Sequence, residues 1–252
     1  MTTTPKNIVL TGSEGLIGRS FRKFAEKKGH KVFCLDLKNI RRKNYYRCDI
    51  TDENSVIQTI KSVLMKSKVD VLINNASSNP KVEGKLSRYK FSNYSYEIWK
   101  KGLSVDLNGS FLMSKHLLKH FEKKNKGIIL NISSIYSLVG PNQNIYAKNK
   151  KKYFGTKPIE YSVAKSGILG FTKSLAAFYS GTDIKVNCLV FGGVKNKKQD
   201  HYFSKNYSNK TIMLRMASAN EYNEYIEFFI SEKNTYTTGS NFIIDGGATN
   251  II

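Results

Sequence analysis

Several features are scarce in this chain of 252 residues, and each scarcity argues against a class of protein. Three cysteines, Cys34, Cys48 and Cys188, are too few for a disulfide framework and lack metal-ligand spacing, so no metal site is expected. We interpret them as reduced packing residues. Only four prolines occur, and no Pro-, Gly- or Ser-rich linker divides the chain. One domain spanning residues 1–252 is therefore predicted.

Long apolar runs are also missing. No stretch approaches the ~20 residues that cross a bilayer. The start, MTTTPKNIVLTG, lacks the basic and then apolar pattern of a secretory signal. The sequence predicts a cytoplasmic protein with no membrane partner.

Acidic residues are few, 19 against 41 basic ones, which gives a formal charge of +22. Clustered basic residues can neutralise nucleic-acid phosphates. However, only seven of the basic residues are arginine, the type that reads base edges and binds phosphate bidentately, and these seven are scattered. We therefore expect no nucleic-acid partner, and interpret the positive field as an aid to attracting an anionic substrate or cofactor.

What is present is a regular alternation of apolar strands and helices. Strand patterns fall at residues 6–12, 31–37, 69–76, 127–134, 184–193 and 239–247, and helix patterns at 16–29, 52–67, 94–124, 160–181 and 219–231. Buried strands that alternate with helices predict an α/β fold, a Rossmann-like doubly wound parallel β-sheet flanked by helices on both faces. Ligands of such folds bind beyond the carboxyl ends of the strands.

A glycine-rich segment, TGSEGLIG, joins the first predicted strand to the first helix. Missing side chains in such a turn let a pyrophosphate approach the helix N-terminus. The predicted cofactor contacts here are Gly12, Ser13, Gly15, Leu16, Ile17 and Gly18.

Asp36 ends the second predicted strand, eighteen residues after Gly18. A carboxylate at this place accepts hydrogen bonds from ribose hydroxyls and repels a 2′-phosphate. The sequence therefore favours NAD(H), while the basic residues Lys38, Arg41 and Arg42 close behind keep NADP(H) as an alternative.

With these motifs the chain resembles the short-chain dehydrogenase/reductase family over nearly its whole length. The resemblance is carried by TGSEGLIG, Asp36, CDITD, NNAS, NISS, YSVAK, VNCLVFGG and TGSNFIIDGG, in this order. It implies that residues 1–90 mainly hold the cofactor and that residues 91–252 carry catalysis and substrate binding. By resemblance, further cofactor contacts are Asp49, Ile50, Asn75, Ala76, Val194, Tyr161 and Lys165.

Hydride transfer leaves the protein one main task, which is to move a proton on and off the substrate oxygen. Tyr161 and Lys165 are four residues apart, so a helix places them on one face, where the cation can stabilise a phenolate. The resemblance assigns the role of hydrogen-bond donor to the substrate oxygen to Ser134 rather than Ser133.

Tyr–Lys pairs at this spacing are common here, because composition alone predicts about two and the sequence holds four. The pair Tyr146/Lys150 even lies closer to the family's usual distance from Ser134. Its surroundings lack an apolar stripe, whereas Tyr161 is followed by one at helical spacing. We therefore favour Tyr161, because a preorganised site needs supported side chains. The other pairs are Tyr96/Lys100 and Tyr153/Lys157.

This choice makes residues 141–160 an insertion beyond the usual spacing, expected to lie over the active site. Its tyrosines and lysines could bind an anionic sugar or nucleotide sugar, although a solvated basic loop is the alternative. Enzymes of bacterial surface-sugar and flagellin-modification pathways look similar in this stretch. Substrate candidates in it are Tyr146, Lys148, Lys150, Lys151, Lys152 and Tyr153. Residues 192–211 are expected to form a lid, with His201 as a surface or substrate-pocket residue.

Some positions depart from the family pattern. Asp106 stands where the family commonly has a fourth catalytic residue, an asparagine, so we include it in the predicted catalytic set and expect an altered proton relay. Phe191 replaces a proline, and Asn196 stands where a threonine is usual. These departures keep two other functions open: a non-catalytic dinucleotide-binding regulatory or scaffold protein, and a reductase of another carbonyl such as a 3-oxoacyl thioester. By resemblance, a homodimer or homotetramer is expected.

Overall fold

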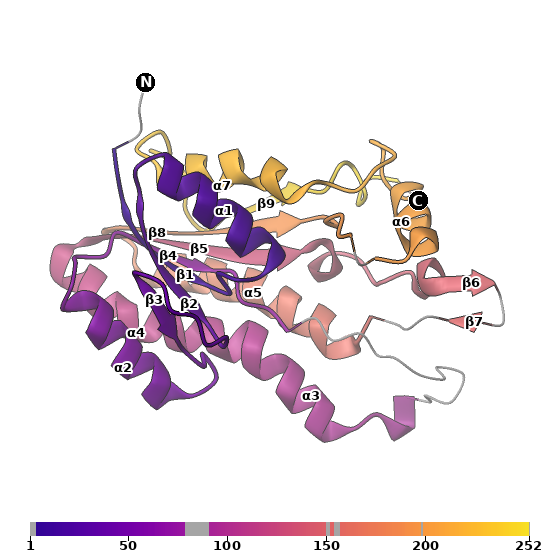
Figure 1. The fold of residues 1–252 in the computed structure, drawn as a ribbon, viewed down its shortest axis with the longest axis horizontal. Coiled ribbons are helices and arrows are strands. Elements are labelled where there is room, and N and C mark those ends of the chain that lie inside the picture. Colours follow the sequence, from indigo (N-terminus) through magenta and orange to yellow (C-terminus); the bar gives the residue numbers. More distant parts are fainter. Residues whose placement is uncertain (1–3, 79–90, 150–151, 154–156, 198, 252) are drawn as a thin grey trace.

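A seven-stranded parallel sheet lies at the centre of the molecule (Figure 1). The structure is a computed structural model, and it describes residues 4–78, 91–149, 152–153, 157–197 and 199–251. Every pairing along the sheet is parallel. The strands run in the order β3 (Tyr45–Arg47), β2 (Lys31–Asp36), β1 (Asn7–Thr11), β4 (Val71–Asn74), β5 (Lys126–Ser134), β8 (Asp183–Phe191) and β9 (Asn241–Ile244).

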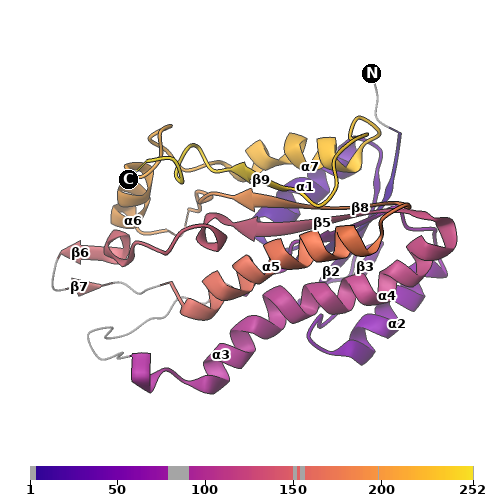
Figure 2. The same cartoon turned by 180° about the vertical axis from the view of Figure 1, so that it is seen from behind.

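Helices cover both faces of this sheet, as Figures 1 and 2 show from opposite sides. One face carries α1 (Leu16–Lys27) and α7 (Asn223–Ile230). The other carries α2 (Glu53–Leu64), α4 (Gly109–Lys124) and α5 (Ile159–Phe178). Helix α3 (Tyr96–Leu103) continues into α4 through one π-helical segment, Ser104–Asn108, and packs against α5. The predicted doubly wound fold is thus confirmed.

The strands have two buried faces because successive side chains point to opposite sides of a sheet. In β1, Ile8 and Leu10 pack with α1 and α7, whereas Val9 packs with α2 and α4. This is why the strands appear in the sequence as continuous apolar runs rather than as alternating patterns. All three cysteines are buried and free, as expected of packing residues.

Strand order fixes where a ligand can bind. The chain moves outward from β1 to β2 and β3, then returns to the other side of β1 to form β4. Connections that leave β1 and β4 toward opposite sides open a crevice at their carboxyl ends. The functional residues that the sequence predicts cluster there.

Two segments lie outside the layered core at one end of the molecule. A short antiparallel hairpin, β6 (Ala147–Asn149) and β7 (Lys152–Tyr153), belongs to the predicted insertion, and α6 (His201–Ser208) belongs to the predicted lid. Lys150, Lys151 and residues 154–156 of the insertion lie outside the described residues. Within the described part of the chain, no helix is both long and apolar enough to span a bilayer.

Candidate active site

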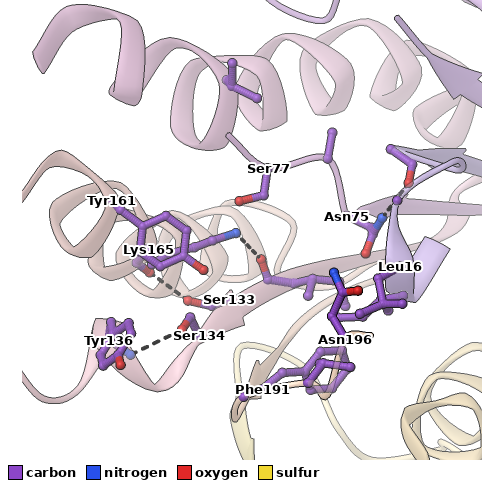
Figure 3. A pocket seen from close by; sticks show the side chains of 18 of the residues that line it. Leu16, Asn75, Ser77, Ser133, Ser134, Tyr136, Tyr161, Lys165, Phe191 and Asn196 are labelled. Carbon is purple, nitrogen blue, oxygen red and sulfur yellow. Dashed lines mark hydrogen bonds between the residues drawn. The ribbon is translucent and has the colours of Figure 1, made fainter. Parts of the chain in front are cut away.

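A cavity of about 650 Å³ opens at the carboxyl ends of β1, β2, β4, β5 and β8 (Figure 3). Its lining includes thirteen of the residues that the sequence predicts for cofactor binding and catalysis. In Figure 3, Leu16 and Asn75 lie on one side, and Ser134 and Tyr161 lie on the other. The thirteen are Gly12, Gly15, Leu16, Ile17, Asp36, Asp49, Ile50, Asn75, Ala76, Ser134, Tyr161, Lys165 and Val194.

The glycine turn after β1 is shaped by close backbone approaches. Gly12 has φ +62°, and a Cβ there would lie 2.7 Å from Ala76 Cα. A Cβ at Gly18 would lie 2.2 Å from Gly12 O. The Asn75 amide closes the arrangement by donating to the carbonyls of Thr11 and Gly12, at 3.0 and 3.1 Å. Asn75 therefore joins the ends of β1 and β4. Ser13 and Gly18 are buried within the turn and do not line the cavity.

Helix α1 begins at this turn with Gly15 as its N-cap residue. No side chain in the described part of the chain caps it, and its first turn carries no acidic residue. The first N–H groups of a helix need acceptors and favour negative charge. Because Leu16 and Ile17 line the cavity, this end of the helix fits the pyrophosphate of a dinucleotide.

Asp36 lies at the end of β2, on the cavity wall. Its carboxylate accepts hydrogen bonds from the backbone N–H groups of Glu14 at 2.9 Å and Lys38 at 3.3 Å. Glu14, which is buried, accepts a 2.6 Å bond from Arg42. Burial opposes the charged form of Glu14, but Arg42, Arg22 and Arg19 together lower the pKa of its carboxyl. The Arg42 guanidinium is thus engaged beside the cavity rather than inside it.

The two adjacent serines at the end of β5 have different surroundings. The Ser133 hydroxyl is buried and donates to the Lys165 carbonyl at 2.9 Å. The Ser134 hydroxyl lies on the cavity wall and accepts from the Tyr136 N–H at 3.3 Å, so its own proton is available to a ligand. Successive side chains of a strand point to opposite faces, which accounts for the difference.

Tyr161 and Lys165 lie on the first turns of α5, one helical turn apart. Lys165 Nζ is 5.7 Å from the centroid of the Tyr161 ring and donates to the Ile132 carbonyl at 3.0 Å. The helix is anchored by Ala164 and Ile168, which are 0% and 1% exposed. Tyr161 is therefore held on a rigid helix, on the same side of the cavity as Ser134 and across from the glycine turn.

Similarity to known proteins decides the family. A sequence model described as enoyl-(acyl carrier protein) reductase matches residues 21–249. Over 98% of its length the chain is 30% identical to the 3-oxoacyl-(acyl-carrier-protein) reductase FabG of Buchnera aphidicola subsp. Baizongia pistaciae, of which it covers 98%. The chain belongs to the short-chain dehydrogenase/reductase family. This confirms the resemblance found in the sequence.

Other members of the short-chain dehydrogenase/reductase family extend the likeness. The chain is 28% identical over 96% of its length to the post-translational flagellin modification protein A of Campylobacter coli, of which it covers 97%. Its structure matches a short chain dehydrogenase from Leptospira borgpetersenii solved with bound NAD+, at 29% identity and a TM-score of 0.86, covering 98% and 94% of the two chains. The protein is an NAD(P)-dependent dehydrogenase/reductase, as the sequence predicted.

Asp106 departs from the usual short-chain dehydrogenase/reductase pattern with structural consequences. It lies in the π-helical segment between α3 and α4, 1% exposed, and its carboxylate is 2.9 Å from Lys165 Nζ. Ser77 Oγ and the Ser78 N–H donate to it at 2.5 and 2.8 Å. Burial opposes the charged form of Lys165, but Asp106 holds the pKa of its ammonium above the ordinary value. Asp106 lies behind Lys165 rather than on the cavity wall.

The remaining departures occur at the end of β8 and in the segment that follows it. Phe191 is 3% exposed and stacks on Tyr222 with ring centroids 3.9 Å apart, so its ring fills the core beside the cavity. Val194 pairs with Ala217 in an isolated bridge, and Asn196 lines the cavity. His201 is exposed at the start of α6, where Asp200 caps the helix.

The competing tyrosine, Tyr146, also lines the cavity but is not part of a helical Tyr–Lys pair. It ends a 3-10 helix, Gln143–Tyr146, and is followed by strand β6, so the helical spacing to Lys150 does not apply. Its ring packs 5.1 Å from that of Phe203, and burial raises the pKa of its phenol. In the described residues, only the pair Tyr161/Lys165 combines a helix with a place on the cavity wall.

Sequence reasoning missed several residues of the cavity wall, among them Tyr136 and Lys157. Tyr136 follows Ser134, and burial followed by the neighbouring Tyr146 raises the pKa of its phenol. Lys157 is 8% exposed, with its Nζ 3.4 Å from the centroid of the Tyr161 ring. Its sequence signals are its place immediately before Pro158 and its spacing of four from Tyr153, and neither singles it out among 34 lysines as a residue of the cavity.

Proposed function

We propose that this enzyme interconverts a carbonyl and a secondary alcohol, with Tyr161 as the general acid and base. The observation that carries the proposal is that Tyr161, Lys165 and Ser134 share one cavity with the glycine turn and Asp36. Proton donor, oxyanion partner and cofactor cradle thus face the same space. The proposal keeps residues 1–90 as the mainly cofactor-binding half and residues 91–252 as the catalytic half.

In this mechanism the chain positions the substrate oxygen and manages its proton. Ser134 donates a hydrogen bond to that oxygen, which strengthens as negative charge develops on it. Tyr161 gives the oxygen a proton during reduction and removes one during oxidation. Lys165 holds its ammonium beside Tyr161 through the Ile132 carbonyl and Asp106. The bound nicotinamide supplies or accepts the hydride.

We also propose that NAD(H) is the preferred cofactor. Asp36 places a fixed carboxylate at the adenosine end of the cavity, which favours ribose hydroxyls over a 2′-phosphate. Arg42, which could have bound a 2′-phosphate, is instead paired with Glu14. Lys38 lines the cavity and is the feature that would let NADP(H) bind.

A sugar or nucleotide sugar is the substrate class that we favour. The substrate side of the cavity is lined by the phenols of Tyr136, Tyr146, Tyr161 and Tyr207 and by the Lys157 ammonium. Phenol hydroxyls and a cation suit a hydroxyl-rich or anionic ligand, and aromatic faces can stack on a ring. A relative named for flagellin modification supports the same direction.

A 3-oxoacyl thioester is the second candidate substrate. Relatives named as 3-oxoacyl-(acyl-carrier-protein) reductases and the matching family description favour it. Apolar residues of the same cavity, Ile135, Phe203 and Met216, could pack on a short acyl chain. The two candidates differ in the polarity that the site must accommodate.

The test measures NADH oxidation with keto-sugars and keto nucleotide sugars against acetoacetyl-coenzyme A. Turnover of a sugar supports the favoured class, and turnover of only the thioester overturns it. Tyr161→Phe should bind NADH normally and lose turnover, whereas Tyr146→Phe, the matched control, should keep it. The reverse result would mean that Tyr146 is the proton donor, and NADH binding without turnover of any compound would favour a non-catalytic role.

For the assembled protein we propose a homodimer or homotetramer located in the cytoplasm. Helices α4 and α5 lie side by side on one face of the molecule (Figure 2) and expose large apolar side chains. Phe111, Val163 and Phe178 are 48%, 41% and 81% exposed. Apolar patches of this kind are typical of subunit contacts.

A further inference from the structure

The end of the inserted segment places a lysine inside the cavity. Lys157 is held by Gln143, whose side chain accepts from the Lys157 N–H at 3.1 Å and donates to the Lys157 carbonyl at 3.2 Å. Pro158 and helix α5 follow immediately. The backbone N–H and carbonyl of Lys157 are therefore both held, and its side chain lines the cavity wall at 8% exposure.

The Lys157 ammonium lies on the face of the Tyr161 ring. Its Nζ is 3.4 Å from the centroid of that ring and 5.7 Å from the centroid of the Tyr136 ring. A cation over an aromatic face is attracted by the ring quadrupole, more strongly when water is excluded. The attraction increases further when the ring carries the negative charge of a phenolate, because it then includes a direct charge–charge contribution.

Lys165, a second cation near Tyr161, is paired with an anion. Lys165 and Asp106 form an ion pair at 2.9 Å, with side chains 4% and 0% exposed. A negative charge this close to Lys165 offsets much of the positive potential that Lys165 exerts at the Tyr161 oxygen. A phenolate at Tyr161 therefore gains less from Lys165 than it would without the Asp106 carboxylate.

We propose that Lys157 is a positioning residue for proton transfer, whose ammonium stabilises the negative charge that Tyr161 acquires on giving its proton to the substrate oxygen. In this arrangement Lys157 supplies positive potential at Tyr161, where Asp106 offsets the potential of Lys165. The inference rests on the proposed role of Tyr161 and adds a residue of the inserted segment to the proton-transfer step.

The arrangement makes the reaction sensitive to pH near neutrality. Burial, followed by repulsion from Lys165, lowers the pKa of Lys157 to about 7, against the attraction of Asp106. Among the residues that the structure describes, the titratable groups that face it include Tyr161 and Lys165 from α5, Asp106 from the π-helical segment and Tyr136 from the turn after β5. Lys157 is charged below pH 7 and loses its charge as the pH rises through 7. Carbonyl reduction should therefore slow as the pH rises above that value.

The experiment compares the pH profile of kcat/KM for carbonyl reduction in wild type, Lys157→Met and Lys157→Arg, with Lys173→Met on exposed α5 surface as the matched control. The substrate is the compound of the panel above that the wild type turns over. Lys157→Met should lower kcat/KM at acid pH by about tenfold, the scale of a desolvated cation–π contact. It should also abolish the decrease of kcat/KM that the wild type shows near pH 7. Lys157→Arg should keep the plateau and extend it to higher pH, because arginine stays charged.

A second readout needs no substrate. Tyrosinate absorbance, taken as the difference between each protein and its Tyr161→Phe counterpart, should appear at higher pH in Lys157→Met than in Lys157→Arg, because the guanidinium stays charged above pH 7. Asp106→Asn should reduce the effect of Lys157→Met in both measurements, because Lys165 then regains its uncompensated charge.

Three outcomes would overturn the inference. They are a decrease of kcat/KM near pH 7 that persists in Lys157→Met, a tyrosinate signal that does not shift, and a Lys157→Arg variant whose pH profile equals that of Lys157→Met. Failure of the proposed function is distinguishable, because Tyr161→Phe would then keep its turnover whatever Lys157 does.

Discussion

At the residue scale, the adjacent serines Ser133 and Ser134 offer a clean comparison of structural and catalytic roles. Ser134 faces the cavity, so Ser134→Ala should lower kcat by about 10²-fold, the scale for losing one donor to a developing oxyanion. Ser133→Ala removes a buried bond to the Lys165 carbonyl and should instead cost about 1 kcal/mol of unfolding free energy, with turnover near wild type. Steady-state kinetics and urea denaturation of both variants check this, and equal losses of turnover would refute the assignment.

Asp36 carries the residue-scale prediction for cofactor preference. We expect wild type to bind NADH more tightly than NADPH, because the carboxylate repels a 2′-phosphate. Asp36→Asn should narrow this difference by about tenfold, or ~1.4 kcal/mol, as measured by quenching of intrinsic fluorescence. Asp183→Asn, at the exposed start of β8, serves as the control for a lost negative charge. Tighter NADPH binding by the wild type would contradict the argument.

At the element scale, the packing of α3 against α5 supports Tyr161 from outside the cavity. A Cβ at Gly102 of α3 would lie 1.9 Å from Glu160 Cγ, on the residue that precedes Tyr161. Gly102→Ala should therefore separate the helices, lower the unfolding free energy by about 1–3 kcal/mol and reduce turnover. Lys101→Ala, exposed on the same helix, should change stability by less than about 0.5 kcal/mol. Equal denaturation midpoints for the two variants would show that Glu160 moves aside freely.

The elements also show what the sequence could predict. Strands such as β1 and β5 and helices such as α1 and α5 follow directly from apolar periodicity and from the glycine turn. Strand β3 was missed because three residues at a sheet edge, two half-buried and one exposed, carry almost no periodic signal. The hairpin of β6 and β7 was missed because its pairing depends on neighbouring segments rather than on local pattern.

The site shows the same division between local and tertiary information. Gly12, Asp36 and Tyr161 could be predicted because motif and strand order place them at one edge of the sheet. The ion pair of Asp106 with Lys165 joins residues far apart in sequence. The contact of Lys157 with Tyr161 depends on how the chain enters α5. Such contacts depend on how elements pack, so residue types alone could not reveal them.

At the scale of the whole molecule, a high charge opposes association and an exposed apolar face favours it. The formal charge is +22, so two copies repel each other at low ionic strength. The exposed apolar side chains of α4 and α5 provide an attraction that salt does not weaken. Association through this face should therefore strengthen as salt is raised, in contrast to a contact held by ion pairs.

Phe178 gives the decisive variant for this assembly, because it is the most exposed of the large apolar residues on the two helices. Burying one phenylalanine contributes ~2 kcal/mol, so Phe178→Asp should weaken association at least about tenfold. Light scattering coupled to gel filtration, over a range of protein and salt concentrations, measures the shift. Tyr225→Asp, at a 49% exposed position on α7 on the opposite face of the sheet, is the control and should leave the assembly unchanged. A monomeric wild type, or an equal effect of both variants, would show that this face is not the subunit contact.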